Sequence, residues 1–325
     1  MKRVVGVAAW AALAWLALLW RLGSFGLAGP DEPRYAAIAA GMLRHKDWIT
    51  PRLWGSPWFE KPVLYYWLAG LSQGVTHVGA AAARRPNAIL AVILCAAMAL
   101  FLRREHSARA GWLAGFMGLS SAFVIGLGRA ATTDMTLTVP LTLALLAGYM
   151  WWQRRGAVTL AWAAVALAFA VLAKGPVAVA LAALILIPFA ATQRRLRDVW
   201  QLARPLPLAL FFIIAAPWYI ALELRQPEFF RVFFLQHNLE RFATNKFEHP
   251  QAWWFYLPVL LLAVFPWTGW LLLPLQSAAR RLRHRGWGGF RDGRDAALKF
   301  YLGLWVLATA ADDEVDDQGN HQRVY

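Results

Sequence analysis

Residues 157–192 have the sequence AVTLAWAAVALAFAVLAKGPVAVALAALILIPFAAT, in which Lys174 is the only charged residue. A helix crosses a bilayer with about 20 mainly apolar residues, or somewhat fewer when flanking residues reach toward the interface. The stretch therefore predicts two membrane spans, at residues 157–173 and 175–192. The apolar residues are continuous rather than alternating, which argues against the strands of a membrane barrel and predicts an all-α fold.

Further membrane spans are expected on both sides of this pair. They are residues 4–22, 86–102, 110–128, 135–152, 205–223, 252–275 and a short run at 296–310. The first run is interpreted as a membrane helix and not a signal peptide, because it is long and no small-residue cleavage site follows it. A share of 59% hydrophobic and 16% charged residues fits this interpretation. The runs together predict a polytopic transmembrane helical bundle of about eight or nine helices over residues 1–310.

The distribution of the net charge of +15 indicates a membrane topology and argues against nucleic acid as a partner. The basic residues form short clusters between apolar runs instead of one stripe. Because short cytoplasmic loops are enriched in Lys and Arg, the amino terminus is placed on the cytoplasmic side of a bacterial inner membrane. The inner clusters are then Arg103, Arg104 and Arg109; Arg154 and Arg155; Arg194, Arg195, Arg197 and Arg204; and Arg280, Arg281, Arg283, Arg285, Arg291 and Arg294.

In this topology the acidic residues gather on the opposite, periplasmic side. They are Asp31, Glu32, Asp47, Glu60, Asp134, Glu223, Glu228, Glu240 and Glu248. Ionisable residues beside membrane segments mark functional sites, so the active site is expected to face the periplasm. The periplasmic loop at residues 23–85 is expected to contain interfacial helices at 33–43 and 62–78, and a mixed aromatic and basic stretch at 227–247 is expected to contact membrane lipid.

Residues 29–68 of that loop have the sequence GPDEPRYAAIAAGMLRHKDWITPRLWGSPWFEKPVLYYWL. Pro30 and Pro33 restrain the turn that holds Asp31 and Glu32. From chemistry alone two interpretations are open. The carboxylates either cap the helix that begins near Pro33 or take part in a reaction.

Two motifs in this loop resemble a known family. The strings DEPRYAAIAAGML at residues 31–43 and FEKPVLYYWL at residues 59–68 are similar to the amino-terminal signature of polyprenyl-phosphate-dependent glycosyltransferases of the GT-C fold. The resemblance is strongest to the bacterial branch of family 39, which contains protein O-mannosyltransferases and the 4-amino-4-deoxy-L-arabinose transferase that modifies lipid A.

The resemblance implies roles for particular residues. Catalytic roles fall on Asp31, Glu32 and Asp134, and contacts to the donor phosphate or substrate fall on Arg34, Tyr35, Lys61, Lys174, His237, Asn238 and Arg241. Glu60 matches a glutamate that has been linked to a divalent metal ion in some members, and no other cofactor is implied. Simpler interpretations stay open for Lys174 as a snorkelling lysine, Asp134 as a helix cap and His237 as a polar residue at headgroup level.

The expected function is transfer of a sugar from an undecaprenyl-phosphate donor to an acceptor at the periplasmic face. The acceptor class is lipid A, a glycan or a protein, and the resemblance favours 4-amino-4-deoxy-L-arabinose transfer to lipid A. Two alternatives are a transporter or flippase for polyprenyl-linked sugars and an inactive, truncated family member. The second alternative is suggested by the polar tail at residues 311–325, ADDEVDDQGNHQRVY, which interrupts the apolar pattern in the manner of a truncation or frameshift.

Overall fold

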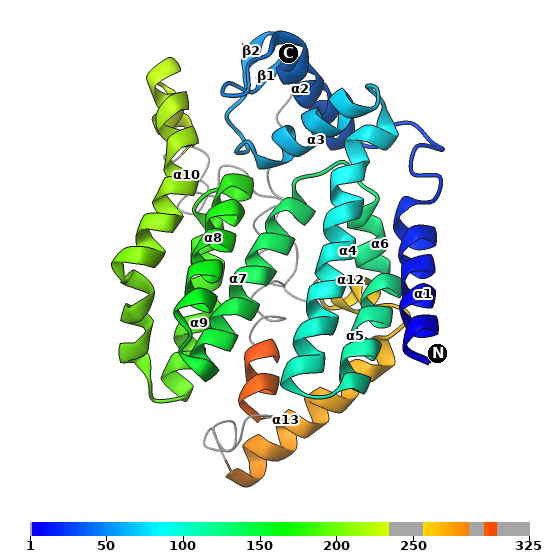
Figure 1. The fold of residues 1–325 in the computed structure, drawn as a ribbon, viewed down its shortest axis with the longest axis vertical. Helices are drawn as coiled ribbons and strands as arrows, with labels where there is room; N and C mark the ends of the chain where they lie inside the picture. Colours follow the sequence, from blue (N-terminus) through cyan, green and yellow to red (C-terminus); the bar gives the residue numbers. More distant parts are fainter. Residues whose placement is uncertain (1, 234–255, 286–295, 304–325) are drawn as a thin grey trace.

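The computed structural model of the chain describes residues 2–233, 256–285 and 296–303, and these residues form a bundle of helices with a helical cap at one end (Figure 1). Four helices are long and apolar enough to cross a membrane: α4 (Ala80–Glu105), α7 (Asp134–Arg154), α8 (Ala157–Lys174) and α10 (Pro205–Arg225). Shorter apolar helices are α1 (Lys2–Ala14), which continues as a π-helix over Trp15–Leu19, and α9 (Val177–Thr192). The chain is therefore a multi-pass membrane protein, and the expected all-α bundle is confirmed.

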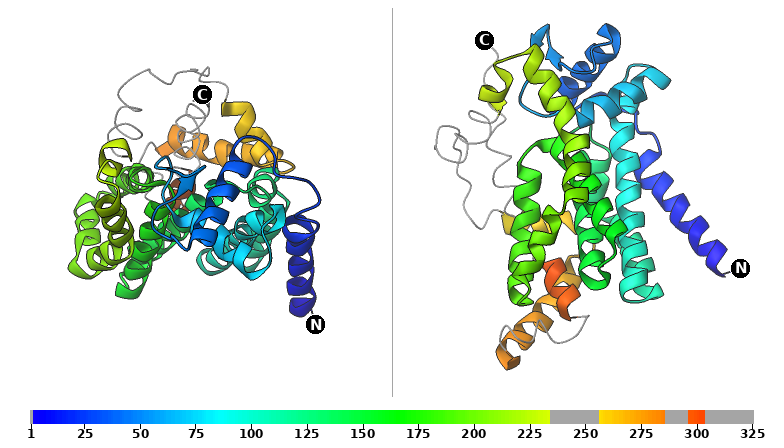
Figure 2. Two further views of the ribbon diagram at one scale, coloured as in Figure 1. Left: turned by 90° about the horizontal axis from the view of Figure 1, so that it is seen from above. Right: turned by 60° about the vertical axis from the view of Figure 1, so that its left-hand side comes forward.

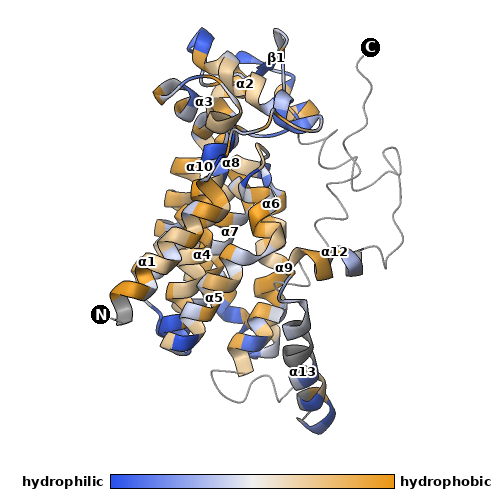
Figure 3. Cartoon of the chain, turned by 90° about the vertical axis from the view of Figure 1, so that its right-hand side faces the viewer, coloured by the Kyte–Doolittle hydropathy of each residue, from blue (hydrophilic) through white to orange (hydrophobic). Residues whose placement is uncertain are grey.

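Helix α7 lies at the centre of the bundle. Of its apolar window 83% is buried, against 22–33% for the other three long helices, so most of the window of each of those helices is not buried. The helices of the bundle consist mostly of hydrophobic residues (Figure 3). Residues Leu141, Leu145 and Tyr149 of α7 belong to the main hydrophobic core. The strongest packing is between α7 and α8, between α4 and α5 (Ala108–Ser120), and between α8 and α10.

The cap consists of the segment between the first helix and α4 (Figure 2). It contains α2 (Asp31–His45) and α3 (Leu64–Val75), which agree with the interfacial helices expected at residues 33–43 and 62–78. A short antiparallel hairpin of β1 (Arg52–Leu53) and β2 (Ser56–Pro57) joins the two helices. The end of the bundle that carries this cap is called the loop end below. The amino-terminal end of α7 and the carboxyl-terminal end of α8 lie there.

The opposite end of the bundle is basic. Arg103 and Arg104 lie in the last turn of α4, and Arg154 lies in the last turn of α7. Arg194 and Arg195 follow α9 after Gln193. The expected separation of basic clusters from the cap is thus present in the fold.

Two expected spans are not continuous helices. The run at 110–128 forms α5 and α6 (Ala122–Gly128), which meet at a bend of 58°. The prediction of one span at 252–275 is wrong, since α12 (Tyr256–Ala263) ends and a 3-10 turn (Thr268–Leu271) precedes α13 (Leu272–Arg285). Pro266 in this break has no backbone N–H to continue a helix.

The two breaks stabilise each other. The Ser121 hydroxyl donates to the carbonyl oxygen of Ala263 at 2.6 Å, and the Trp267 indole N–H donates to the Ser120 hydroxyl at 2.9 Å. The amide of Ala122 donates to the carbonyl oxygen of Phe265 at 2.9 Å. Each break therefore satisfies backbone groups that the other exposes.

The close contact between α4 and α5 requires a glycine on α5, and this requirement gives a test of the packing. A Cβ atom at Gly111 would lie 2.5 Å from the carbonyl oxygen of Ala99 and 2.6 Å from the Cβ atom of Arg103. Gly111→Ala is therefore expected to lower the free energy of unfolding by about 1–3 kcal/mol, measured by thermal unfolding in detergent micelles. The control is Gly126→Ala, because a Cβ there meets nothing within 4 Å. Equal unfolding midpoints for both variants would contradict this close approach.

Candidate active site

Asp31, Arg34 and Glu60 form an ionic cluster on the cap. The Arg34 Nη1 atom lies 3.3 Å from Asp31 Oδ1 and 3.9 Å from Glu60 Oε2. The guanidinium also lies over the Trp58 ring, 5.3 Å from the ring centroid. The cluster is accessible, since between 17% and 27% of each of the three charged side chains is exposed. The first turn of α2 and the segment before α3 thus bring together two carboxylates and one cation.

A second ionic pair lies where α7 begins and α8 ends. Lys174 Nζ lies 3.3 Å from Asp134 Oδ1, and only 9% of the lysine side chain is exposed. Asp134 is the first residue of α7, and the residue at its N-cap position, Thr133, makes no capping hydrogen bond through its side chain. Asp134 therefore interacts with Lys174 across two helices, which is a different arrangement from the helix cap considered above.

A row of aromatic rings connects the surroundings of these two ionic groups. Phe59, next to Glu60, packs against Phe229 with the ring centroids 5.5 Å apart, and Phe229 stacks on Phe233 at 5.3 Å. Phe233 in turn covers Gly175, where a Cβ atom would lie 2.7 Å from the Phe233 Cζ atom. Gly175 has φ +76° and ends α8 directly after Lys174. The aromatic row thus connects the cap to the end of α8.

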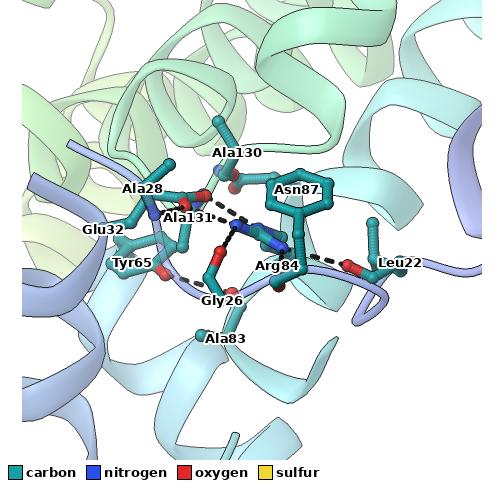
Figure 4. A network of polar contacts seen from close by, with 11 residues as sticks. Leu22, Gly26, Ala28, Glu32, Tyr65, Ala83, Arg84, Asn87, Ala130 and Ala131 are labelled. Atoms are coloured by element: carbon teal, nitrogen blue, oxygen red, sulfur yellow. Dashed lines mark hydrogen bonds and ion pairs between the residues drawn. The ribbon is translucent and has the colours of Figure 1, made fainter. Parts of the chain in front are cut away.

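Glu32, in the first turn of α2, belongs to a buried network between the cap and the bundle, which Figure 4 shows from close by. Its Oε1 atom accepts from Arg84 Nε at 2.9 Å and from the amide of Ala131 at 2.7 Å. Its Oε2 atom accepts from Arg84 Nη2 at 2.6 Å and from the amide of Ala28 at 2.6 Å. Both carboxylate oxygens are therefore engaged by the protein itself. This geometry favours a positioning role for Glu32 over the catalytic role implied by the resemblance.

The network also changes the acidity of Glu32. Burial raises the pKa of this carboxyl, but hydrogen bonds from Arg84, Ala28 and Ala131 and the charge of Arg84 act in the other direction. These favourable interactions outweigh the burial, and the pKa of Glu32 is lowered below its ordinary value of 4.5. Glu32 is therefore ionised at neutral pH.

The remaining expected site residues differ in their surroundings. Tyr35 is buried in a group of tyrosine rings, 6.1 Å from Tyr65 and 6.0 Å from Tyr66 between centroids. Lys61 is half-buried and follows Glu60 directly. His237, Asn238 and Arg241 lie outside the residues that the structure describes, as does most of the stretch at 227–247.

The described residues do not fit a divalent metal site. In that part of the chain no group of three His, Cys, Asp or Glu side chains lies at ligand spacing. The cation that lies near the Glu60 carboxylate is the Arg34 guanidinium. A divalent ion needs several oxygen ligands, and the described residues supply no group of three acidic, His or Cys side chains for it.

Sequence reasoning missed Arg84 and Asn87, which belong to the network around Glu32. Both lie in the first turns of α4, in the string AAAARRPNAIL at residues 80–90. Two arginines and an asparagine inside an apolar helix are costly unless they are paired, and this was the available signal. Their partners lie at distant positions in the chain. Polar residues in an apolar helix could therefore have pointed to Arg84 and Asn87, but not to the groups that they contact.

Comparison with known proteins gives consistent matches. The chain matches the family model described as dolichyl-phosphate-mannose-protein mannosyltransferase over residues 4–233. It is 33% identical over 287 residues to the undecaprenyl phosphate-alpha-4-amino-4-deoxy-L-arabinose arabinosyl transferase of Aeromonas salmonicida, covering 86% of this chain and 50% of that protein. The transferase of the same name from Edwardsiella ictaluri is 33% identical over 317 residues, covering 94% of this chain and 54% of the relative. The chain spans about half the length of these relatives.

Solved structures give the same result. The crystal structure of ArnT from Cupriavidus metallidurans bound to undecaprenyl phosphate matches with a TM-score of 0.76 at 25% identity, over 96% of this chain and 60% of that chain. The oligosaccharyltransferase of Archaeoglobus fulgidus matches with a TM-score of 0.50 at 14% identity, over 96% of this chain and 50% of that chain, and shares the fold alone. The expected GT-C membrane fold is confirmed.

The lowered pKa of Glu32 predicts how stability depends on pH. Because the folded-state pKa lies below the unfolded value, ionised Glu32 stabilises the fold fully above pH about 4.5, and this contribution is lost as the pH falls through the folded-state pKa. Glu32→Gln is expected to lower the unfolding midpoint at pH 6–8, because it leaves Arg84 buried without its counter-charge. Thermal unfolding in detergent across pH 3–8 measures this. A difference between parent and variant that does not narrow below pH about 4.5 would contradict the assignment.

Proposed function

Because this chain belongs to the dolichyl-phosphate-mannose-protein mannosyltransferase family, we propose that it is a glycosyltransferase that uses an undecaprenyl-phosphate sugar as donor. The sugar passes to an acceptor at the periplasmic face of the bacterial inner membrane. The names of the relatives favour 4-amino-4-deoxy-L-arabinose as the sugar. Lipid A is the preferred acceptor class, ahead of a glycan or a protein.

The observation that carries this proposal is the arrangement at the loop end. A deeply placed cation, Lys174, lies at the end of a membrane helix, and the cluster of Asp31, Arg34 and Glu60 lies on the cap that is joined to the same helix end by the aromatic row. A polyprenyl phosphate has an apolar tail and an anionic headgroup, which match the lipid-facing helices and the cations above them.

The reaction breaks the bond between the sugar C1 atom and a phosphate oxygen. An acceptor oxygen forms the new bond to C1, and undecaprenyl phosphate leaves with the electron pair. Lys61 and Lys174 are assigned to stabilise the charge that develops on the leaving phosphate. Asp31 takes the proton when the acceptor is a hydroxyl, and it orients the acceptor when this is an ionised lipid A phosphate.

Arg34 is assigned to orient the two carboxylates beside it. Its contacts to Asp31 and Glu60 hold both acids in one cluster while Trp58 covers the guanidinium. Glu32 is assigned a positioning role through Arg84, as its geometry favours. The roles of His237, Asn238 and Arg241 at the donor phosphate remain those that the resemblance implies.

A transporter of polyprenyl-linked sugars is supported less well. Transporters place charged residues and interrupted helices near the middle of the membrane. In α4, α7, α8 and α10, the charged side chains lie within the first two or the last two turns of each helix. Charges at helix ends fit a reaction at the membrane surface better than a path through the membrane.

The proposed orientation predicts which end of the bundle an impermeant reagent reaches. Trp54, in the cap, and Trp200, at the basic end, are each 79% exposed, and Cys95 is buried and gives little background labelling. In intact spheroplasts a membrane-impermeant maleimide is expected to label Trp54→Cys and to label Trp200→Cys only after permeabilisation. The reverse pattern would place the cap in the cytoplasm.

The proposed catalytic roles predict the effect of two substitutions on sugar transfer. Asp31→Asn and Lys61→Ala are each expected to lower transfer from a radiolabelled undecaprenyl-phosphate sugar by at least about 100-fold, since each removes a group that acts in the transition state. The measurement uses membranes with equal amounts of inserted protein.

Arg44→Ala is the matched control for these substitutions, because Arg44 is exposed in the last turn of the same cap helix. It is expected to retain parental activity. Parental activity in Asp31→Asn would remove that residue from the mechanism, and a well-inserted parent without transfer would contradict the proposed activity of this chain.

A further inference from the structure

Arg84 makes contacts that tie the cap to the bundle. Its side chain is fully buried and makes five hydrogen bonds, two of them to Glu32. The other three go to backbone carbonyl oxygens in the segment between the first helix and α2: Leu22 at 3.1 Å, Phe25 at 3.1 Å and Gly26 at 2.8 Å. The guanidinium also lies 4.0 Å from the centroid of the Phe25 ring. One side chain of α4 therefore fixes both the entry to α2 and its second residue.

Asn87 makes the corresponding contacts one turn later on α4. Its side-chain amide donates to the carbonyl oxygens of Ala130 and Thr132, each at 2.7 Å. The amide of Ala131, between them, donates to Glu32 (Figure 4). The turn that leads into α7 is thus bound both by Asn87 of α4 and by Glu32 of α2.

The contacts of Arg84 and Asn87 each lie close in the chain to an acidic residue of the candidate active site. Glu32 follows Asp31 directly, and Thr132 precedes Asp134 by two residues. We propose that Arg84 and Asn87 are positioning residues, which set the placement of the Asp31 and Asp134 carboxylates relative to each other. This inference rests on the proposed function, because it assigns the two acids to one site.

The chemistry of the network makes arginine specific at this position. Arginine presents its N–H groups in a planar fork that pairs with a carboxylate at two points, whereas lysine has a single ammonium group on a flexible stem. Lysine at position 84 retains the charge but loses the paired geometry and several of the carbonyl contacts. A small displacement of catalytic groups lowers rate by about 100-fold when their geometry is productive only over a narrow range.

The test compares Arg84→Lys with Arg85→Lys. Arg85 is the next residue on α4, and its guanidinium lies near the hydroxyls of Ser72 and Thr76, away from the network. Asn87→Ala is a milder second variant that removes only the two bonds to the turn before α7. Hydrogen–deuterium exchange measures protection of residues 22–35 and 126–137, and transfer assays separate kcat from the KM for the donor.

The expected result is local. Arg84→Lys loses protection in these two segments but not in α8 and α9, and its kcat falls about 100-fold while the donor KM stays within about threefold of the parent value. Asn87→Ala loses protection at residues 126–137 and shows a smaller fall in kcat. Arg85→Lys retains the parental values.

Two results would overturn the inference. One is a kcat for Arg84→Lys within about threefold of that for Arg85→Lys, and the other is a loss of protection throughout the bundle, which indicates a general structural role. If a folded and inserted parent transfers no sugar, the proposed function fails, and the exchange data alone decide the positioning role. Parental protection at residues 22–35 and 126–137 in Arg84→Lys then rejects it.

Discussion

A buried guanidinium and a buried carboxylate hold the loop end of this protein together. Arg84 and Glu32 would each be very costly to bury alone, because the surroundings offer little water to solvate a charge. They are tolerated because each charge is paired with the other and with backbone groups from two segments, residues 22–28 and the turn before α7. Helix α2, the segment before it and the turn before α7 therefore depend on one another. If one of the two charges is removed, the other stays buried without a counter-charge, and its desolvation is no longer offset. The network therefore forms as a unit.

The candidate site arises from two kinds of packing that meet at the loop end. Helix packing brings Asp134 and Lys174 together, because α7 and α8 are adjacent and antiparallel and share the strongest contact in the bundle. The cap brings Asp31 and Glu60 to Arg34 through a folded loop, which owes its position to the network beneath it. The aromatic row then connects the two arrangements. A site of this kind places ions at the level of the headgroups, where a lipid phosphate can reach them while its tail stays in the bilayer.

The sequence predicted most helices because bilayer thickness sets a length and an apolar composition that are visible in the chain. It failed where tertiary contacts decide the backbone: the breaks at Ser121 and near Pro266 exist because each satisfies the other's polar groups. The motifs around Asp31 and Lys61 predicted that the chemistry takes place at the cap, and this stays a prediction. They could not distinguish the partly exposed Asp31 from the buried Glu32 beside it, since the burial of Glu32 depends on Arg84, 52 residues later. Only the folded arrangement separates the two acids.

We expect the cap and the ends of α7 and α8 to form one site for a lipid phosphate. A structure determined by electron cryomicroscopy with undecaprenyl phosphate added tests it most directly. We expect density for the phosphate at the loop end, within hydrogen-bonding reach of Lys61 and Lys174, and density for the polyprenyl tail against the lipid-facing helices. A phosphate bound at the basic end of the bundle, or one that contacts neither lysine, would show that the cap and these helix ends do not form the phosphate site.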